Sequence, residues 1–163
     1  MTPAASIAAS LFTLDLRTAM ATKKIHSVLV TAKIESLEDL YGVERGGMSA
    51  NQVRRVEVTD AVINTAATML SMPKRLIARL GLRHIRKQQA LTSASAMTIH
   101  VYGTVRLTIM ERDCIADVAE VPDDCPMQID RITLHLLDFV VDPVSHRLIG
   151  DPAHGGEPML DLF

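Results

Sequence analysis

Residues 61–68 read Ala-Val-Ile-Asn-Thr-Ala-Ala-Thr, an apolar run that ends in a turn of small residues. The run continues a β-region that begins at Val53, so a strand is predicted to enter the core and end in this turn. A helix is expected next, over residues 71–81, with Ser71 or Met72 as its cap and Pro73 in its first turn. This strand–turn–helix unit is the strongest candidate for a functional site.

Strand patterns dominate the chain on both sides of this unit. Residues 25–34 are rich in β-branched side chains, and residues 97–109 alternate apolar and polar residues over seven periods. Residues 87–103 are therefore predicted to form a hairpin, whose tip is Ser93-Ala94-Ser95. Residues 114–121 are predicted to return as a further strand after a turn.

Short elements complete the pattern. Residues 35–44 favour one or two helical turns, and residues 127–129 a short buried strand. A short helix capped by Thr133 is predicted over residues 134–139, before a closing hairpin at residues 140–149. Together these patterns predict a mostly β domain, closed or sandwiched, with two short helices and a flap-like hairpin.

Residues 62–67 resemble the active-site signature of the retropepsin-like aspartic peptidases, and the predicted elements follow one another in the order found in that family. That signature is two apolar residues, then Asp-Thr-Gly or Asp-Ser-Gly, then Ala. The resemblance covers roughly residues 24–150 and includes Gln128-Ile129-Asp130, where the family has two apolar residues and Gly. The stretch 150–157 looks like that of bacterial single-domain members. The resemblance implies a retropepsin-like closed β domain.

The family's chemistry implies a site shared between two chains. Two carboxylates about 3 Å apart share one proton and hold a water that attacks the peptide carbonyl. One motif copy per chain implies a homodimer with the site on its two-fold axis. The catalytic positions would be Asn64, Thr65 and Ala66. An extended peptide would lie against Ala67 and beneath the hairpin tip at Ser93, Ala94 and Ser95.

The chain departs from the family at the positions that carry this chemistry. Asn64 stands where the family has its aspartate, and an amide has no proton to shuttle. Ala66 and Asp130 stand where the family has glycines, and the tip at residues 93–95 lacks glycine as well. We therefore expect an aspartic peptidase-like homodimer, a pseudoenzyme that retains peptide binding but not the hydrolase activity of a protease.

Two other functions stay open from the sequence. An active aspartic endopeptidase would need a rescuing carboxylate, either Asp60 or Asp130, or a related chain that supplies the aspartate in a heterodimer. A dimer that serves only as a structural or interaction protein would need no groove at all. The simplest structural interpretation of Asn64 and Thr65 is that they hydrogen-bond across a tight turn.

Composition excludes several classes of protein. The net charge is −2, aromatic residues make up 3% and the basic runs are short, so nucleic-acid binding is not expected. No apolar run is long enough to cross a membrane, and no membrane partner is expected. Residues 1–22 are expected to be a loose N-terminal extension and not a secretion signal. Residues 23–150 form the predicted domain, and residues 151–163 a C-terminal tail.

The cysteines and histidines predict neither a cofactor nor a metal. Cys114 and Cys125 are interpreted as small buried hydrophobes in a reduced, cytoplasmic protein, with a disulfide between them as an alternative that nothing in the sequence supports. The six histidines show no spacing typical of a zinc site.

Overall fold

The computed structural model describes residues 27–162. The predicted extension at residues 1–22 lies outside the described residues. The elements, in chain order, are β1 (Leu29–Ser36), α2 (Leu37–Glu44), η1 (Ala50–Gln52), β2 (Arg55–Asn64), β3 (Ser71–Pro73), α3 (Lys74–Leu80), β4 (Arg83–Leu91), β5 (Ala96–Ile109), β6 (Arg112–Val121), β7 (Gln128–Asp130), α4 (Arg131–Leu136), β8 (Phe139–Val141), β9 (Leu148–Gly150) and η2 (Pro152–His154).

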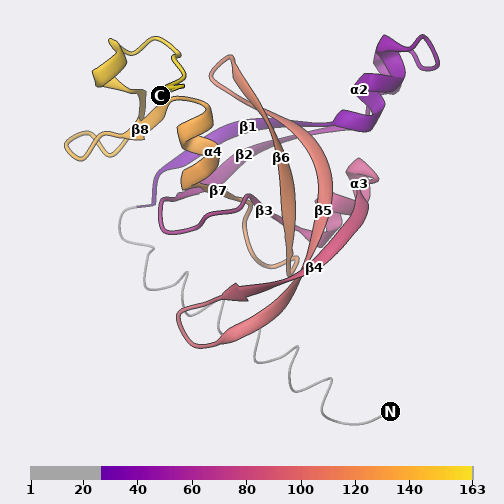
Figure 1. The fold of residues 1–163 in the computed structure, drawn as a ribbon, viewed down its shortest axis with the longest axis horizontal. Coiled ribbons are helices and arrows are strands. Elements are labelled where there is room, and N and C mark those ends of the chain that lie inside the picture. The colour runs from indigo at the N-terminus through magenta and orange to yellow at the C-terminus, as the bar shows by residue number, and fades with distance from the viewer. Residues whose placement is uncertain (1–26, 163) are drawn as a thin grey trace.

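Six of the strands close into a barrel (Figure 1). The order is β1-β2-β7-β3-β6-β5, and β1 pairs with β5 to close it. Most neighbours are antiparallel, but β2 runs parallel to β7, and β3 runs parallel to β6. The mostly β, closed domain predicted from the sequence is therefore confirmed.

The alternation along β5 explains how the barrel interior is filled. Val101, Val105, Leu107 and Ile109 are buried, while the residues between them face outward or lie half-buried. Aliphatic residues from β1, β2, β7 and α3 complete one continuous core. Burial of these side chains is the main source of stability in a chain with so few aromatic residues.

The predicted hairpin is formed by β4 and β5 and projects from the barrel (Figure 1). β4 pairs only with β5 in the described sheet, and most of its side chains are exposed. The turn between the strands is held by Thr92, whose backbone N–H donates to the Ser95 carbonyl at 2.9 Å. The hairpin tip is therefore an ordered turn at residues 92–95.

The helices differ from the predictions in number and in their caps. Three short α-helices are present and not two, because α2 forms a full helix capped by Ser36. The helix α3 begins only at Lys74, since Ser71–Pro73 form strand β3 against β6 and β7; Pro73, not Ser71 or Met72, is its N-cap residue.

The other predicted cap was also wrong. Asp130, not Thr133, caps α4, which begins at Arg131 and ends at Leu136 instead of reaching residue 139. The residues from Phe139 onward are taken up by strand β8, which pairs with β9 in the predicted closing hairpin. No described helix has the length and apolar character needed to cross a membrane.

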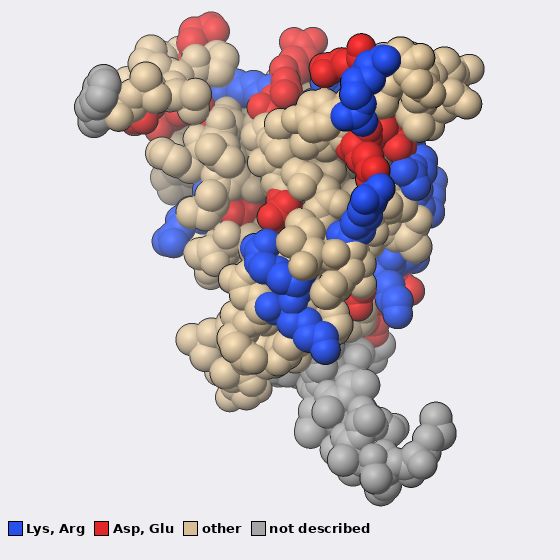
Figure 2. Space-filling view, turned by 45° about the vertical axis from the view of Figure 1, so that its right-hand side comes forward, with Lys and Arg blue, Asp and Glu red and all other residues tan. Residues whose placement is uncertain are grey.

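The surface carries charges of both signs. On the face drawn in Figure 2, basic and acidic side chains lie interspersed among wide uncharged areas. Several are paired, including Arg54 with the buried carboxylate of Asp39 at 2.7 Å and Arg106 with that of Glu35 at 2.8 Å. The hydrogen bond from Arg54 lowers the pKa of Asp39, so this pair remains charged at neutral pH.

Candidate functional site

The motif turn begins where β2 leaves the barrel. Asn64 is half-buried, and its side-chain Nδ2 donates to Oε1 of Gln128 on β7 at 2.7 Å. Its Oδ1 accepts from the backbone N–H of Ala66 at 3.2 Å, and its carbonyl accepts from Ala67 at 3.1 Å. The Asn64 side chain therefore holds both its own turn and the neighbouring strand.

The parallel pairing of β2 and β7 brings the two sequence segments of the predicted site together. Asn64 is the register partner of Asp130, and the N–H of Arg131 donates to the carbonyl of Ala67 at 3.0 Å. The turn after β2 is thereby joined to the start of α4. Thr65 and Ala66 are exposed and Ala67 is half-buried, so the turn presents its small side chains to solvent.

Asp130 has a structural task at this position. Its side chain is 1% exposed and accepts from the N–H groups of Ile132 and Thr133, at 2.9 and 3.1 Å, and from the Thr133 hydroxyl. These bonds satisfy donors in the first turn of α4 that would otherwise lack partners. Asp130, which stands where the family has glycine, therefore serves here as the N-cap of α4.

Asp60 and Asp130, the two carboxylates that could replace the missing catalytic aspartate, are poorly placed to do so. Asp130 is engaged by three donors of α4. Asp60 is exposed on β2, four residues before Asn64, which at the rise of a strand is about 13 Å along the chain. Neither side chain lies at the position of Asn64, where the family has its catalytic aspartate.

The hairpin tip forms the other half of the predicted site. Ser93, Ala94 and Ser95 are all exposed, and the Thr92 hydroxyl oxygen accepts from the N–H groups of Ala94 and Ser95 at 3.3 and 3.1 Å. The tip is thus shaped by Thr92, in place of the glycines that the family uses.

One open groove of about 830 Å³ lies beside the start of β1, which pairs with the part of β2 that leads into the motif turn. It runs between the start of β1, the turn joining β5 to β6, and the β8–β9 hairpin; its described lining includes Val28, Met110 and His146. None of its described lining residues belongs to the motif turn or to the hairpin tip. Within one chain, the motif turn is thus an exposed surface and not the floor of this groove.

Neither cysteine forms a disulfide in the described part of the chain. Burial, with the negative charges of Asp130 and Asp113, raises the pKa of Cys114 to about 11. Cys125 is buried. Because the thiolate is the reactive form, Cys114 is unsuited to nucleophilic catalysis at neutral pH, in line with the structural role predicted for both.

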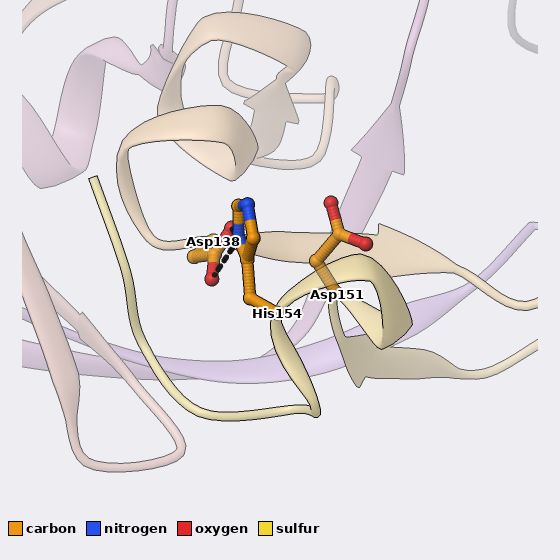
Figure 3. A group of neighbouring side chains, drawn as sticks. All are labelled: Asp138, Asp151 and His154. Carbon is orange, nitrogen blue, oxygen red and sulfur yellow. Dashed lines mark hydrogen bonds and ion pairs between the residues drawn. The ribbon is translucent and has the colours of Figure 1, made fainter. Parts of the chain in front are cut away.

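One cluster of ionisable groups escaped the sequence analysis. Asp138, Asp151 and His154 bring one potential ligand atom each to within 4.8 Å of one another (Figure 3). His154 Nδ1 lies 2.9 Å from both carboxylate oxygens of Asp138, which also accepts from the N–H of Met159 at 3.1 Å. The cluster ties the residues after β9 back to the end of α4.

The pKa values of this cluster follow from the ion pair. The hydrogen bond from His154 lowers the pKa of Asp138, and the same bond raises the pKa of His154. Asp151 is occupied as the cap of η2, where it accepts from Ala153 at 2.9 Å. Because the β8–β9 hairpin separates the partners in sequence, no short motif marks the cluster.

Neither a scan against protein-family models nor a search of curated proteins found a match for this chain.

Proposed function

We propose that this chain is a retropepsin-like, aspartic peptidase-type protein that acts as a homodimer, binds an extended peptide and does not hydrolyse it. The proposal is supported by the sequence resemblance and by the order of elements. A barrel strand, the turn at Asn64, a helix, a projecting hairpin and a short buried strand with its helix follow one another, and the turn and the buried strand meet in space.

The observation that carries the proposal is the environment of Asn64. An aspartic peptidase needs two carboxylates that share a proton at this position. Here the side chain is an amide, and hydrogen bonds to Gln128 and to the Ala66 N–H hold it in place. A dimer built about this turn would juxtapose two amides, which neither donate nor accept the proton that hydrolysis requires.

Exposed apolar side chains support a partner for the face that carries α4. Ile132 and Leu136 on this helix are 47% and 45% exposed, and Met159, Leu160 and Leu162 follow in the C-terminal residues. The N–H of Met159 bonds to Asp138 just after α4, so both groups lie at one end of the molecule. Apolar surface of this kind is typical of subunit interfaces.

Dimerisation is tested by sedimentation equilibrium at micromolar concentration, where a species of twice the chain mass is expected. Leu136→Glu should weaken the dimer, because it places a charge on the apolar face of α4. Tyr41→Glu is the matched control, since Tyr41 is similarly exposed, at 44%, on the distant helix α2 (Figure 1). A folded wild-type chain that stays monomeric would refute the shared-site model.

Peptide binding and cleavage are tested together with a library of extended peptides between about pH 3 and 7, the range in which a shared-proton carboxylate pair titrates. Saturable binding without cleavage is expected. Ala94→Arg at the hairpin tip should weaken binding, whereas Ala78→Arg on the exposed side of α3 should not. Pepstatin-sensitive cleavage by the unaltered chain would support the endopeptidase alternative, and a folded dimer that binds no peptide would favour a purely structural dimer.

A further inference from the structure

Two histidines meet at the root of the projecting hairpin. His84 lies on β4 and His100 on β5, and Nε2 of His84 is 3.0 Å from Nδ1 of His100. The register pairs His84 with Tyr102 and Lys87 with His100, with an irregularity in β4 between His84 and Arg86. His100 lies two residues before Tyr102, so His84 and His100 are diagonal neighbours on one face of the hairpin.

The ring packing fixes the direction of these nitrogens. The centroids of the two imidazoles are 5.1 Å apart and the rings are inclined by 57°. The ring of Tyr102 packs edge-on against His84, with centroids 5.4 Å apart. His84 is exposed and His100 is half-buried, so the nitrogens are held by neighbouring rings but remain open to an ion from solvent.

The separation of the nitrogens matches that of two ligands on one metal ion. With metal–nitrogen bonds of about 2.0–2.1 Å, ligands at 90° lie about 2.9 Å apart and ligands at a tetrahedral angle about 3.4 Å. The observed 3.0 Å is close to the first value. A right angle between imidazoles is typical of square-planar or octahedral ions such as Cu²⁺ and Ni²⁺.

We propose that His84 and His100 form a two-imidazole binding site for a divalent transition-metal ion of the copper–nickel class, with solvent in the remaining positions. Binding breaks the hydrogen bond between the two nitrogens. Each ring then presents a lone pair to the ion, and the proton that lay between the rings moves, by exchange with solvent, to the other nitrogen of the ring that carried it, so both imidazoles stay neutral. The ion then links β4 to β5 and stiffens the hairpin. This inference concerns the root of the hairpin and not its tip, and a different chemistry from the peptide site, and it stands without the proposed function.

The test uses the full chain and the metal salts alone. We expect titration with Cu²⁺ and Ni²⁺ to show one site, with Cu²⁺ bound more tightly, as expected for nitrogen ligands. The electron paramagnetic resonance spectrum of the Cu²⁺ complex should show coupling to two nitrogens. His84→Gln and His100→Gln should each lower the affinity at least about tenfold and leave a single coupled nitrogen or none.

Two further variants separate this site from its surroundings. His154→Gln removes the imidazole of the Asp138 cluster and should change neither the affinity nor the two-nitrogen signal. Lys87→Gln removes the positive charge opposite His100 and should tighten binding. The proposal is overturned if His84→Gln and His100→Gln, both shown to be folded by circular dichroism, bind Cu²⁺ as the wild type does, or if His154→Gln abolishes the signal.

Discussion

The Asp130 cap gives the sharpest test of the interpretation of the site. In Asp130→Ala, the first turn of α4 loses its cap, which costs about 1 kcal/mol. The Thr133 hydroxyl, in a residue only 3% exposed, also loses its acceptor, which costs about 1–3 kcal/mol for a buried polar group. The free energy of unfolding should therefore fall by about 2–4 kcal/mol.

The measurement is urea unfolding followed by circular dichroism, because the chain has no Trp. With a denaturant dependence of about 2 kcal/mol per molar urea, the midpoint should fall by about 1–2 M. Asp130→Asn keeps a good capping side chain and should shift the midpoint by less than half as much as Asp130→Ala.

A matched control separates burial from hydrogen bonding. Asp142, in the β8–β9 turn, likewise accepts from two backbone N–H groups and from the hydroxyl of the residue three positions on, Ser145, but Ser145 is exposed. Asp142→Ala should give a clearly smaller shift, because water replaces the lost bonds. Equal shifts for Asp130→Ala and Asp142→Ala would refute the argument that burial makes the Asp130 cap costly to remove.

Three further predictions concern activity, reactivity and pH. Asn64→Asp alone should not give acid-dependent peptide cleavage, because in the proposed dimer the methyl group of Ala66 would face the partner copy where the family has glycine. Adding Ala66→Gly should give measurably more cleavage, and peptide assays of both folded variants check this. With a pKa of about 11, Cys114 has about one thiolate in a thousand at pH 8, so alkylation followed by mass spectrometry should be much slower in the native chain than in urea. The pair of Asp138 and His154 should stabilise the fold most between about pH 4 and 6.5. The pKa of Asp138 is lowered in the folded chain, so its contribution is lost as the pH falls through that folded-state pKa. The pKa of His154 is raised in the folded chain, so its contribution is lost as the pH rises through that folded-state pKa. A stability profile with the same shape in wild type and His154→Gln would contradict that assignment.

Local patterns predicted those parts of the fold whose structure depends on neighbouring residues. The alternation over residues 97–109 identified β5, because one face of that strand is buried and side chains alternate with period two. The hairpin and the closing turn were also marked by short polar stretches between strands. The closed β domain follows from these strands, whereas the retropepsin-like assignment stays a prediction.

Features that depend on distant partners could not be predicted in the same way. Pro73 suits the first turn of a helix, but pairing with β6 and β7 extends the strand through it. Asp138 and His154 lie 16 residues apart and meet only because a hairpin folds between them. Asp130 is a residue type that commonly caps helices, but the cap was predicted at Thr133, because the family resemblance placed Asp130 in the second loop of the site.

The two departures at Asn64 and Asp130 are physically connected. These residues are register partners on adjacent parallel strands, so a carboxylate at both positions would place two like charges about one strand spacing apart, roughly 4.8 Å between backbones. The amide at Asn64 avoids that repulsion and also donates to Gln128, while Asp130 is free to cap α4.

Asn64→Asp should therefore destabilise the chain at pH 7, and it should do so less in an Asp130→Asn background, where the second charge is gone. Unfolding midpoints of the four chains in this double-mutant cycle measure the coupling. Strictly additive changes in the unfolding free energy would show that the side chains at positions 64 and 130 act independently. Coupling of the expected sign would show that a carboxylate at position 64 repels the carboxylate of Asp130, which caps α4.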